Sequence, residues 1–264
     1  MADRRDATSP RIILPALAAG ALLGLPILAV LARAPWNALT DHLGASEVRA
    51  ALVLSAITSA ASASLSLALG IPLAVVLSQS RGTAARILRA LTTLPIVLPP
   101  VVAGVALLLA FGRTGLIGGW LWSAFGIQLT FTPVAVVMAQ TFVAMPFLVL
   151  TIEGALRQAD ADLADAAATA GATRWQALRH VTLPSIGPAV AAGAMLAWAR
   201  AFGEFGATIT FAGSFPGRTE TMPIAVYLAL QSDPSTAIAL SLVMVAVSVT
   251  VLVLLRERWW ISAR

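Results

Sequence analysis

Arg200 and Glu204 are charged residues inside a long apolar stretch of this 264-residue sequence. They stand four positions apart, so they lie on one face of a helix and can form an ion pair. Each charge alone in hydrocarbon would cost about 2.5–3.5 kcal/mol, so we expect both to face protein or water. The pair is either a structural link between helices or part of an anion path or gate. Thr208 and Thr210 could donate hydroxyls to an anion, although threonines more often bond their own helix backbone.

Several other chemistries are disfavoured by the residues present. The sequence has no cysteine, hence no disulfide and no thiolate, and its two histidines, His42 and His180, are isolated. All 17 basic residues are arginine, so the lysine of a phosphate-binding loop is missing and this chain does not hydrolyse ATP by that route. The H-E-x-x-H and G-x-S-x-G motifs are also missing. We therefore expect neither a metal nor a cofactor bound by this chain, and no enzyme.

The elements that position these residues are expected to be transmembrane helices. The sequence is 59% hydrophobic and 11% charged, with a mean hydropathy of +0.89, which is too little charge to cover a soluble domain of this size. Six apolar stretches are long enough to span a bilayer. They lie at about Ile12–Leu31, Leu52–Leu77, Leu94–Phe111, Pro133–Ile152, Ala189–Ile209 and Ala237–Leu255. The sequence thus predicts an all-α membrane protein with six transmembrane helices.

Two of these stretches need a qualification. The third is the shortest and contains Pro95, Pro99 and Pro100, so we expect a kinked or tilted helix there. The first could be read as a signal peptide, but its apolar run is longer than a signal core and a proline follows the possible cleavage site. A retained membrane anchor is the favoured interpretation. The serines of the second stretch (Ser55, Ser59, Ser62, Ser64 and Ser66) are expected to pack against a neighbouring helix.

The arginines predict the orientation. Twelve lie in the N-terminal tail, the second and fourth loops and the C-terminal tail, and four lie in the opposite loops. The first group is Arg4, Arg5, Arg11, Arg81, Arg86, Arg89, Arg157, Arg174, Arg179, Arg256, Arg258 and Arg264; the second is Arg33, Arg49, Arg113 and Arg218. Basic loops stay in the cytoplasm, so both termini are predicted to be cytoplasmic. The even number of spans agrees with this prediction, because it places both termini on the same side of the membrane.

The longest loop, residues 153–188, is therefore expected in the cytoplasm as a helix, a tight turn and a second helix. Glu153 to Ala170 is rich in helix-forming residues, and Gly171 would end this helix in a left-handed conformation. Thr173 can cap a second helix, Arg174 to Val181, which Pro184 is expected to stop. Such a compact knob suits docking into a groove on a soluble partner.

The knob also resembles a known motif. Asp165, Ala166 and Ala167, followed by Gly171, Val181, Leu183 and Pro184, are similar to the E-A-A-x3-G-x9-I-x-L-P loop of binding-protein-dependent ABC importer permeases, with Asp165 in place of Glu and Val181 in place of Ile. The resemblance implies a type I importer fold in which this loop seats in a separate ATPase. It also implies two such ATPase subunits using ATP and Mg, a second copy of this chain, and an extracytoplasmic binding protein. An ordinary amphipathic connector is the alternative.

A second resemblance concerns the substrate. The runs 199–208 (A-R-A-F-G-E-F-G-A-T), 216–223 (P-G-R-T-E-T-M-P) and 111–115 (F-G-R-T-G) are similar to the molybdate branch of oxyanion permeases. The resemblance covers residues 48–256, which would form the transmembrane domain, leaving residues 1–47 as the N-terminal tail, first span and external loop, and 257–264 as a cytoplasmic tail. It implies import of molybdate or tungstate into a bacterial cell across the cytoplasmic membrane.

Some alternatives stay open at this point. Sulfate or thiosulfate is a second substrate class, and an ATP-independent carrier or a membrane enzyme would be a different kind of protein. Arg113 and Arg218 are expected on the external face, where they either meet an acidic surface of the binding protein or are simply solvated.

Overall fold

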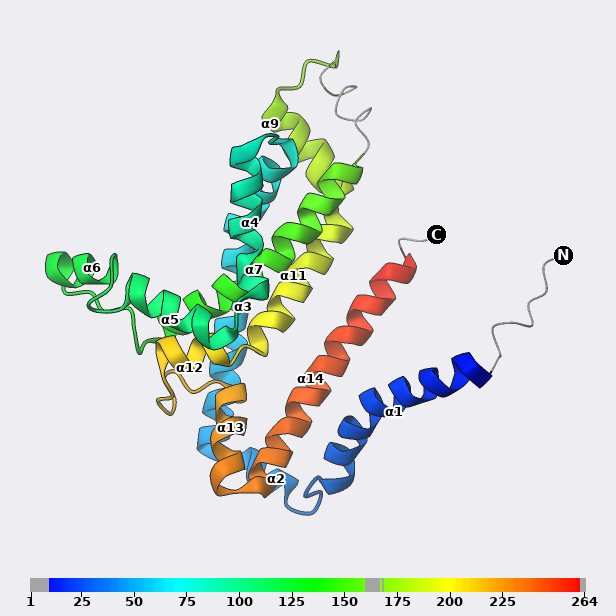
Figure 1. The fold of residues 1–264 in the computed structure, drawn as a ribbon, viewed down its shortest axis with the longest axis vertical. Coiled ribbons are helices and arrows are strands. Elements are labelled where there is room, and N and C mark those ends of the chain that lie inside the picture. The colour runs from blue at the N-terminus through cyan, green and yellow to red at the C-terminus, as the bar shows by residue number, and fades with distance from the viewer. Residues whose placement is uncertain (1–9, 160–166, 168, 262–264) are drawn as a thin grey trace.

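The computed structural model describes residues 10–159, 167 and 169–261, and this part of the chain is helical without a strand. Figure 1 shows the arrangement. The first half contains α1 (Pro10–Arg33), α2 (Leu39–Gly44), α3 (Ser46–Gln79), α4 (Thr83–Val97), α5 (Pro100–Phe111), α6 (Gly118–Phe125) and α7 (Pro133–Gln158). The second half contains α9 (Arg174–Ala177), the π-helical turn η2 (Leu178–Thr182), α10 (Leu183–Ser185), α11 (Gly187–Phe202), α12 (Gly206–Ala212), α13 (Met222–Ser232) and α14 (Pro234–Ile261).

Four helices in the described residues are long and apolar enough to cross a membrane unbroken. They are Arg11–Arg33, Ser46–Gln79, Pro133–Gln158 and Pro234–Val253. These correspond to the predicted first, second, fourth and sixth spans, which confirms the long helices at those places. The other two predicted spans are interrupted, and the interruptions are the main difference between the sequence interpretation and the structure.

In the predicted third span, Leu94–Phe111, the expected disturbance at the prolines is confirmed, but it is a break at Leu98 and Pro99 rather than a kink within one helix. The N–H of Leu98 closes α4 on the carbonyl of Leu94, and both Leu98 and Pro99 then adopt extended ψ values near 133° and 134°. A residue that precedes a proline is forced away from helical geometry. Leu98 precedes Pro99, and Pro99 itself precedes Pro100, so both are affected. Pro100 then starts α5, where its missing N–H costs nothing.

The predicted fifth span, Ala189–Ile209, is also wrong as one helix. Helix α11 ends at Phe202 and α12 begins at Gly206, with a short connection between them. At its other end α11 is bent by 73° from the helical segment Arg174–Ser185, and the two together pass as a fifth, broken span. Helices α5 and α13 are shorter apolar helices.

Helix α7 lies at the centre of the packing. One apolar cluster joins α3, α7 and α11 through residues such as Leu77, Leu148 and Ala201. A second joins α5, α7 and α12 and includes Val136 and Phe211. Four of the five serines of the second predicted span are fully buried on α3, as expected, and Ser62 accepts a hydrogen bond from Thr141 of α7 at 3.2 Å. The expectation is wrong for Ser64, which is exposed and bonds the carbonyl of Ala60.

Candidate functional site

The two interrupted spans meet each other. Helix α5, after the first break, packs against α12, after the second, and both lie across the long helices in Figure 1. The contact depends on glycine: a Cβ at Gly206 would lie 2.6 Å from Cβ of Pro100, and one at Gly104 would lie 2.6 Å from Cβ of Thr210. No real Cβ tolerates such distances, so larger residues would force the two helices apart. We call this contact the glycine crossing.

Arg200 and Glu204 hold the second break together. Nη1 of Arg200 lies 2.6 Å from Oε2 of Glu204, and Oε1 of Glu204 accepts the N–H of Ala207 at 2.9 Å. The side chain of Glu204 is 1% exposed and that of Arg200 is 30% exposed. The predicted ion pair therefore forms. It links the last turn of α11 to the first turn of α12, within one interrupted span rather than between two separate helices.

Arg200 also lines a cavity of about 110 Å³ at the first break. The other lining residues come from that break and from α7: Pro95, Ile96, Leu98, Pro100, Ala103, Val143 and Phe147. A guanidinium offers five N–H donors, and one carboxylate does not use them all. A cationic donor in an otherwise apolar wall is suited to an oxyanion, because hydrogen bonds between ions are stronger where water is scarce.

The threonines predicted near the path behave differently from each other. Thr210 donates its hydroxyl to the carbonyl of Gly206 at 2.8 Å, the ordinary backbone bond of a helical threonine. Thr208 is fully buried, and its hydroxyl has no hydrogen-bond partner among the residues that the structure describes. Gln140 of α7 is likewise buried, and within the same described ranges both of its amide atoms lack a partner. Gln140 was not predicted from the sequence, although an amide within the apolar fourth span was a visible signal.

The turn of the knob forms as the sequence predicts, but the predicted helix Glu153–Ala170 is wrong as one element. Helix α7 continues through Glu153 to Gln158 and ends at Ala159, whose ψ of 141° is extended, so the knob follows α7. Gly171 has φ +87°, and the N–H of Ala172 bonds the carbonyl of Ala167 at 3.0 Å, which is the six-to-one bond of a glycine-terminated helix. Thr173 caps the next helix reciprocally: its hydroxyl accepts the N–H of Gln176 at 3.3 Å, and the Gln176 side chain accepts the N–H of Thr173 at 2.8 Å. Asp165 and Ala166 lie outside the described residues.

The second helix of the knob does not stop before Pro184, so that prediction is wrong. Helical structure runs from Arg174 to Ser185 through the π-turn, in which the N–H of Leu183 bonds the carbonyl of Leu178. Pro184 has no N–H for the carbonyl of His180 and its ring would press on that group in a regular α-helix. The wider π-turn relieves this conflict. Val181 is half-buried, and Leu183 packs against the α3–α7–α11 cluster, which ties the knob to the bundle.

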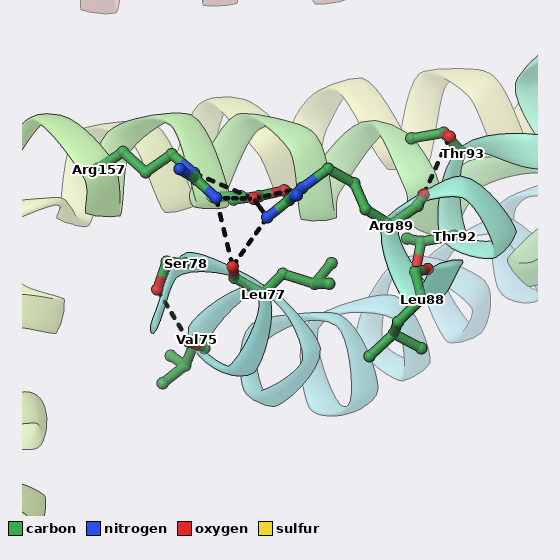
Figure 2. Close-up of polar contacts among 9 residues, drawn as sticks. Val75, Leu77, Ser78, Leu88, Arg89, Thr92, Thr93 and Arg157 are labelled. Atoms are coloured by element: carbon green, nitrogen blue, oxygen red, sulfur yellow. Dashed lines mark hydrogen bonds and ion pairs between the residues drawn. The ribbon is translucent and has the colours of Figure 1, made fainter. Parts of the chain in front are cut away.

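A charged cluster joins the helix ends beside the knob. Nη2 of Arg89 and Nη2 of Arg157 lie 2.8 and 3.0 Å from Oε1 of Glu153, whose side chain is 6% exposed. The same two arginines donate to the carbonyl of Leu77, at 3.0 and 3.4 Å, near the end of α3. Figure 2 shows Arg89 and Arg157 approaching this carbonyl from opposite sides. We call Arg89, Glu153, Arg157 and the Leu77 carbonyl the arginine cluster. It connects α3, α4 and α7 where the chain leaves for the knob.

The other predicted residues lie on loops away from the knob, Arg113 between α5 and α6 and Arg218 between α12 and α13. Arg113 and Arg218 are both exposed on separate loops, and the guanidinium of Arg113 stacks 4.1 Å from the ring centre of Trp122. Glu47, Glu220 and Asp233 line a separate cavity of about 220 Å³ between α3, α13 and α14. Burial and then the charge of Glu47 raise the pKa of Glu220, whereas the Thr236 hydroxyl lowers the pKa of Asp233. These carboxylates would repel an anion, so this cavity is a poor anion route.

Sequence comparison finds relatives over most of the chain. Residues 66–261 match the family model described as binding-protein-dependent transport system inner membrane component. The molybdenum transport system permease protein ModB of Mycobacterium tuberculosis is 48% identical over 227 residues, 86% of each protein. ModB of Escherichia coli is 41% identical over 182 residues, 69% of this chain and 80% of that protein. The sulfate transport system permease protein CysT of Escherichia coli is 33% identical over 213 residues, 80% of this chain and 76% of that protein.

Solved structures show the same fold at low sequence identity. A bacterial ABC transporter involved in import of the polysaccharide alginate matches with a TM-score of 0.69 and 17% identity, covering 99% of this chain and 96% of its own. The MetNI methionine ABC transporter, in an inward-facing conformation, matches with a TM-score of 0.57 and 18% identity, covering 81% of this chain and 99% of its own. The interrupted spans therefore occur within an ABC importer permease fold.

Proposed function

This chain belongs to the family of binding-protein-dependent transport system inner membrane components, and from that premise we propose that it is the permease subunit of an ATP-driven molybdate importer. It is a multi-pass membrane transport subunit rather than an enzyme. The observation that carries the proposal is the position of α11. One end of this helix follows the knob through the 73° bend, and the other ends at Arg200 and Glu204. Movement of the knob thus acts directly on the break beside the cavity.

The proposed assembly follows from the same arrangement. Two copies of this chain would each present a knob, with Asp165, Ala166, Ala167 and Gly171, to one of two ATPase subunits that use ATP and Mg. Both termini would then be cytoplasmic in a bacterial cytoplasmic membrane, as the arginine distribution predicts. An extracytoplasmic binding protein would deliver the anion at the opposite end, where Arg113 and Arg218 are exposed. A periplasmic protein is bound in the related alginate transporter structure.

Alternating access would use the interrupted spans. Closure of the ATPases pulls the knobs, α11 transmits the pull, and the glycine crossing opens or closes. In this proposal Arg200 contacts the passing anion, with the Thr208 hydroxyl as a further donor, while Glu204 holds the break in shape. A single guanidinium that is already paired with a carboxylate binds an anion weakly, and weak binding favours release. Tungstate would follow the same route, since it is also a tetrahedral dianion.

The substrate is tested by competition in a reconstituted complex containing this chain, its ATPase and its binding protein. We expect uptake of labelled molybdate that requires ATP and is inhibited by unlabelled molybdate and tungstate, but only weakly by sulfate. The chain purified alone should not hydrolyse ATP. Equal inhibition by sulfate would favour the sulfate or thiosulfate alternative, for which the CysT relative is the precedent. Uptake without ATP would instead indicate a secondary carrier.

Gly171→Val tests the coupling role of the knob. The left-handed φ of +87° is open to glycine but strained for valine by about 1–2 kcal/mol, although no atom of the described residues lies within 4 Å of the new Cβ. We therefore expect the turn to open and the knob to lose its shape. ATPase activity should continue while uptake falls severely, and membrane insertion should be unchanged.

Gly126→Val is the matched control for this substitution. Gly126 also has a left-handed φ, +67°, and no atom of the described residues lies within 4 Å of a Cβ placed there, but it ends α6, which projects from the side of the bundle away from the knob (Figure 1). It should strain the backbone similarly without separating ATP hydrolysis from uptake. Unchanged uptake in Gly171→Val, or equal uncoupling in both variants, would argue against the coupling role.

A further inference from the structure

Helix α6 and its flanking turns form an exposed apolar element that the transport mechanism does not use. Residues 114–131 contain no charged side chain. Most of the large apolar side chains in this segment are exposed, Leu116 by 89% and Phe125 by 63%. The others are Ile117, Trp120, Trp122, Ile127 and Phe131. We call residues 114–131 the aromatic loop. In Figure 1 its helix projects sideways from the bundle, at the far end of α5.

The aromatic loop is nevertheless a built structure. The N–H groups of Leu116 and Ile117 bond the carbonyls of Leu109 and Ala110 at 3.0 and 2.8 Å, and Gly118 is so close to the end of α5 that a Cβ there would overlap its carbonyl oxygens. Gly126 ends α6 with a left-handed cap. Its aromatic side chains are therefore held outward by backbone geometry, and a defined apolar surface of this kind requires a partner.

The bilayer is the partner that the surface fits. The exposed side chains of the aromatic loop continue those of α5, where Val101 and Leu109 are 57% and 67% exposed. Helix α6 has only eight residues, too few to cross a membrane but enough to lie along its surface. Tryptophan is typical of the membrane–water interface, because its ring is apolar and its N–H needs water or a headgroup.

Arg113 agrees with this depth. Its guanidinium stacks on Trp122 at 4.1 Å while the residue stays exposed, a position open both to the binding protein proposed above and to lipid phosphates beside the aromatic ring. The loop also lies at the end of α7 opposite the knob, between α5 and α7 in the chain. We propose that the aromatic loop lies in the headgroup boundary of the leaflet opposite the knob and anchors the outer end of α5 there. This inference goes beyond the transport function, because it assigns a lipid surface.

The chain allows a direct test, since it contains no cysteine that would first have to be removed. A nitroxide would be attached at Trp120→Cys in the assembled complex, reconstituted in phosphatidylethanolamine and phosphatidylglycerol vesicles. Collision of the label with oxygen, which concentrates in hydrocarbon, is compared with collision with a water-soluble nickel complex. Leu22→Cys, 75% exposed near the middle of the first span, is the hydrocarbon reference, and Arg218→Cys, measured with the binding protein omitted, is the water reference.

We expect the ratio of the two collision rates at position 120 to fall between those of the references. A ratio equal to either reference would overturn the proposed depth. A label shielded from both oxygen and nickel would also overturn it, because the surface would then be covered by a second copy or another protein. Phe125→Cys repeats the measurement from the same helix, so a local disturbance at position 120 cannot decide the result. Unlabelled chain in vesicles of brominated lipid gives a second readout, in which Trp120→Phe should lower the quenched share of tryptophan fluorescence.

Discussion

Glu204→Ala is expected to remove most of the assembled transporter from the membrane. The substitution leaves the N–H of Ala207 without its buried acceptor, at about 1–3 kcal/mol. It also leaves Arg200 unpaired beside an apolar cavity, at about 2.5–3.5 kcal/mol. Together these costs are a large part of the stability of an ordinary domain, about 5–15 kcal/mol. The measurement is the amount of complex recovered in mild detergent and its thermal unfolding temperature.

A charge-free double variant separates the two proposed roles of the pair. Arg200→Met with Glu204→Gln removes both charges, while the Gln amide oxygen can still accept the N–H of Ala207. We expect assembly to return and molybdate uptake to stay at least about tenfold low, which is a barrier increase of about 1.4 kcal/mol. Full uptake by the double variant would make Arg200 a structural residue only. A clean change of anion preference in Glu204→Gln alone would place Glu204 itself in the path.

Glu153→Ala is the second substitution for which we expect a large effect. It removes the carboxylate that both arginines of the arginine cluster share and leaves two like charges facing each other at the end of α3. Both arginines are partly exposed, so water offsets part of the loss, and we expect about 1–3 kcal/mol. The unfolding temperature should fall by several degrees. Uptake should fall more than ATP hydrolysis, because the knob loses its fixed base.

Arg86→Ala is the matched control for the arginine cluster. Arg86 lies one turn before Arg89 on α4 and is exposed. Its loss should change neither the unfolding temperature nor the ratio of uptake to hydrolysis, whereas Arg89→Ala should resemble Glu153→Ala in weaker form. If Glu153→Ala and Arg86→Ala gave the same ratio of uptake to ATP hydrolysis, the arginine cluster would have no role in transmitting movement from the knob.

Short-range sequence patterns were enough to predict the parts of the site that depend on residues close together in the chain. The left-handed Gly171, the cap at Thr173 and the pairing of Arg200 with Glu204 each follow from spacings of four residues or fewer, and the structure confirms all three. The four unbroken spans were also predictable, since continuous apolar runs in lipid have helix as their stable form.

Features that depend on distant residues were not predictable in the same way. Prolines signal a disturbance, but whether the chain resumes in line or turns aside after Pro99 depends on what it packs against, here α12. Arg89 and Glu153 are 64 positions apart, so their contact was invisible: Arg89 had been counted among the loop arginines, although it lies on α4, and Glu153 had been taken only as the start of the loop helix. The π-turn before Pro184 was missed because proline normally marks the end of a helix, and a wider turn is the rarer solution.

The two broken spans have a consequence for the resting membrane. Each break frees backbone N–H and C=O groups from the helix, and such groups persist within the bilayer only when protein or water satisfies them. Water that reached both breaks would give protons and small ions a path across the membrane. The close approach of Gly206 to Pro100 and of Gly104 to Thr210 would then act as a seal. A bulkier residue at either glycine would open this path. Ions would then leak and dissipate the electrochemical gradient of the cell, even when no anion is being transported.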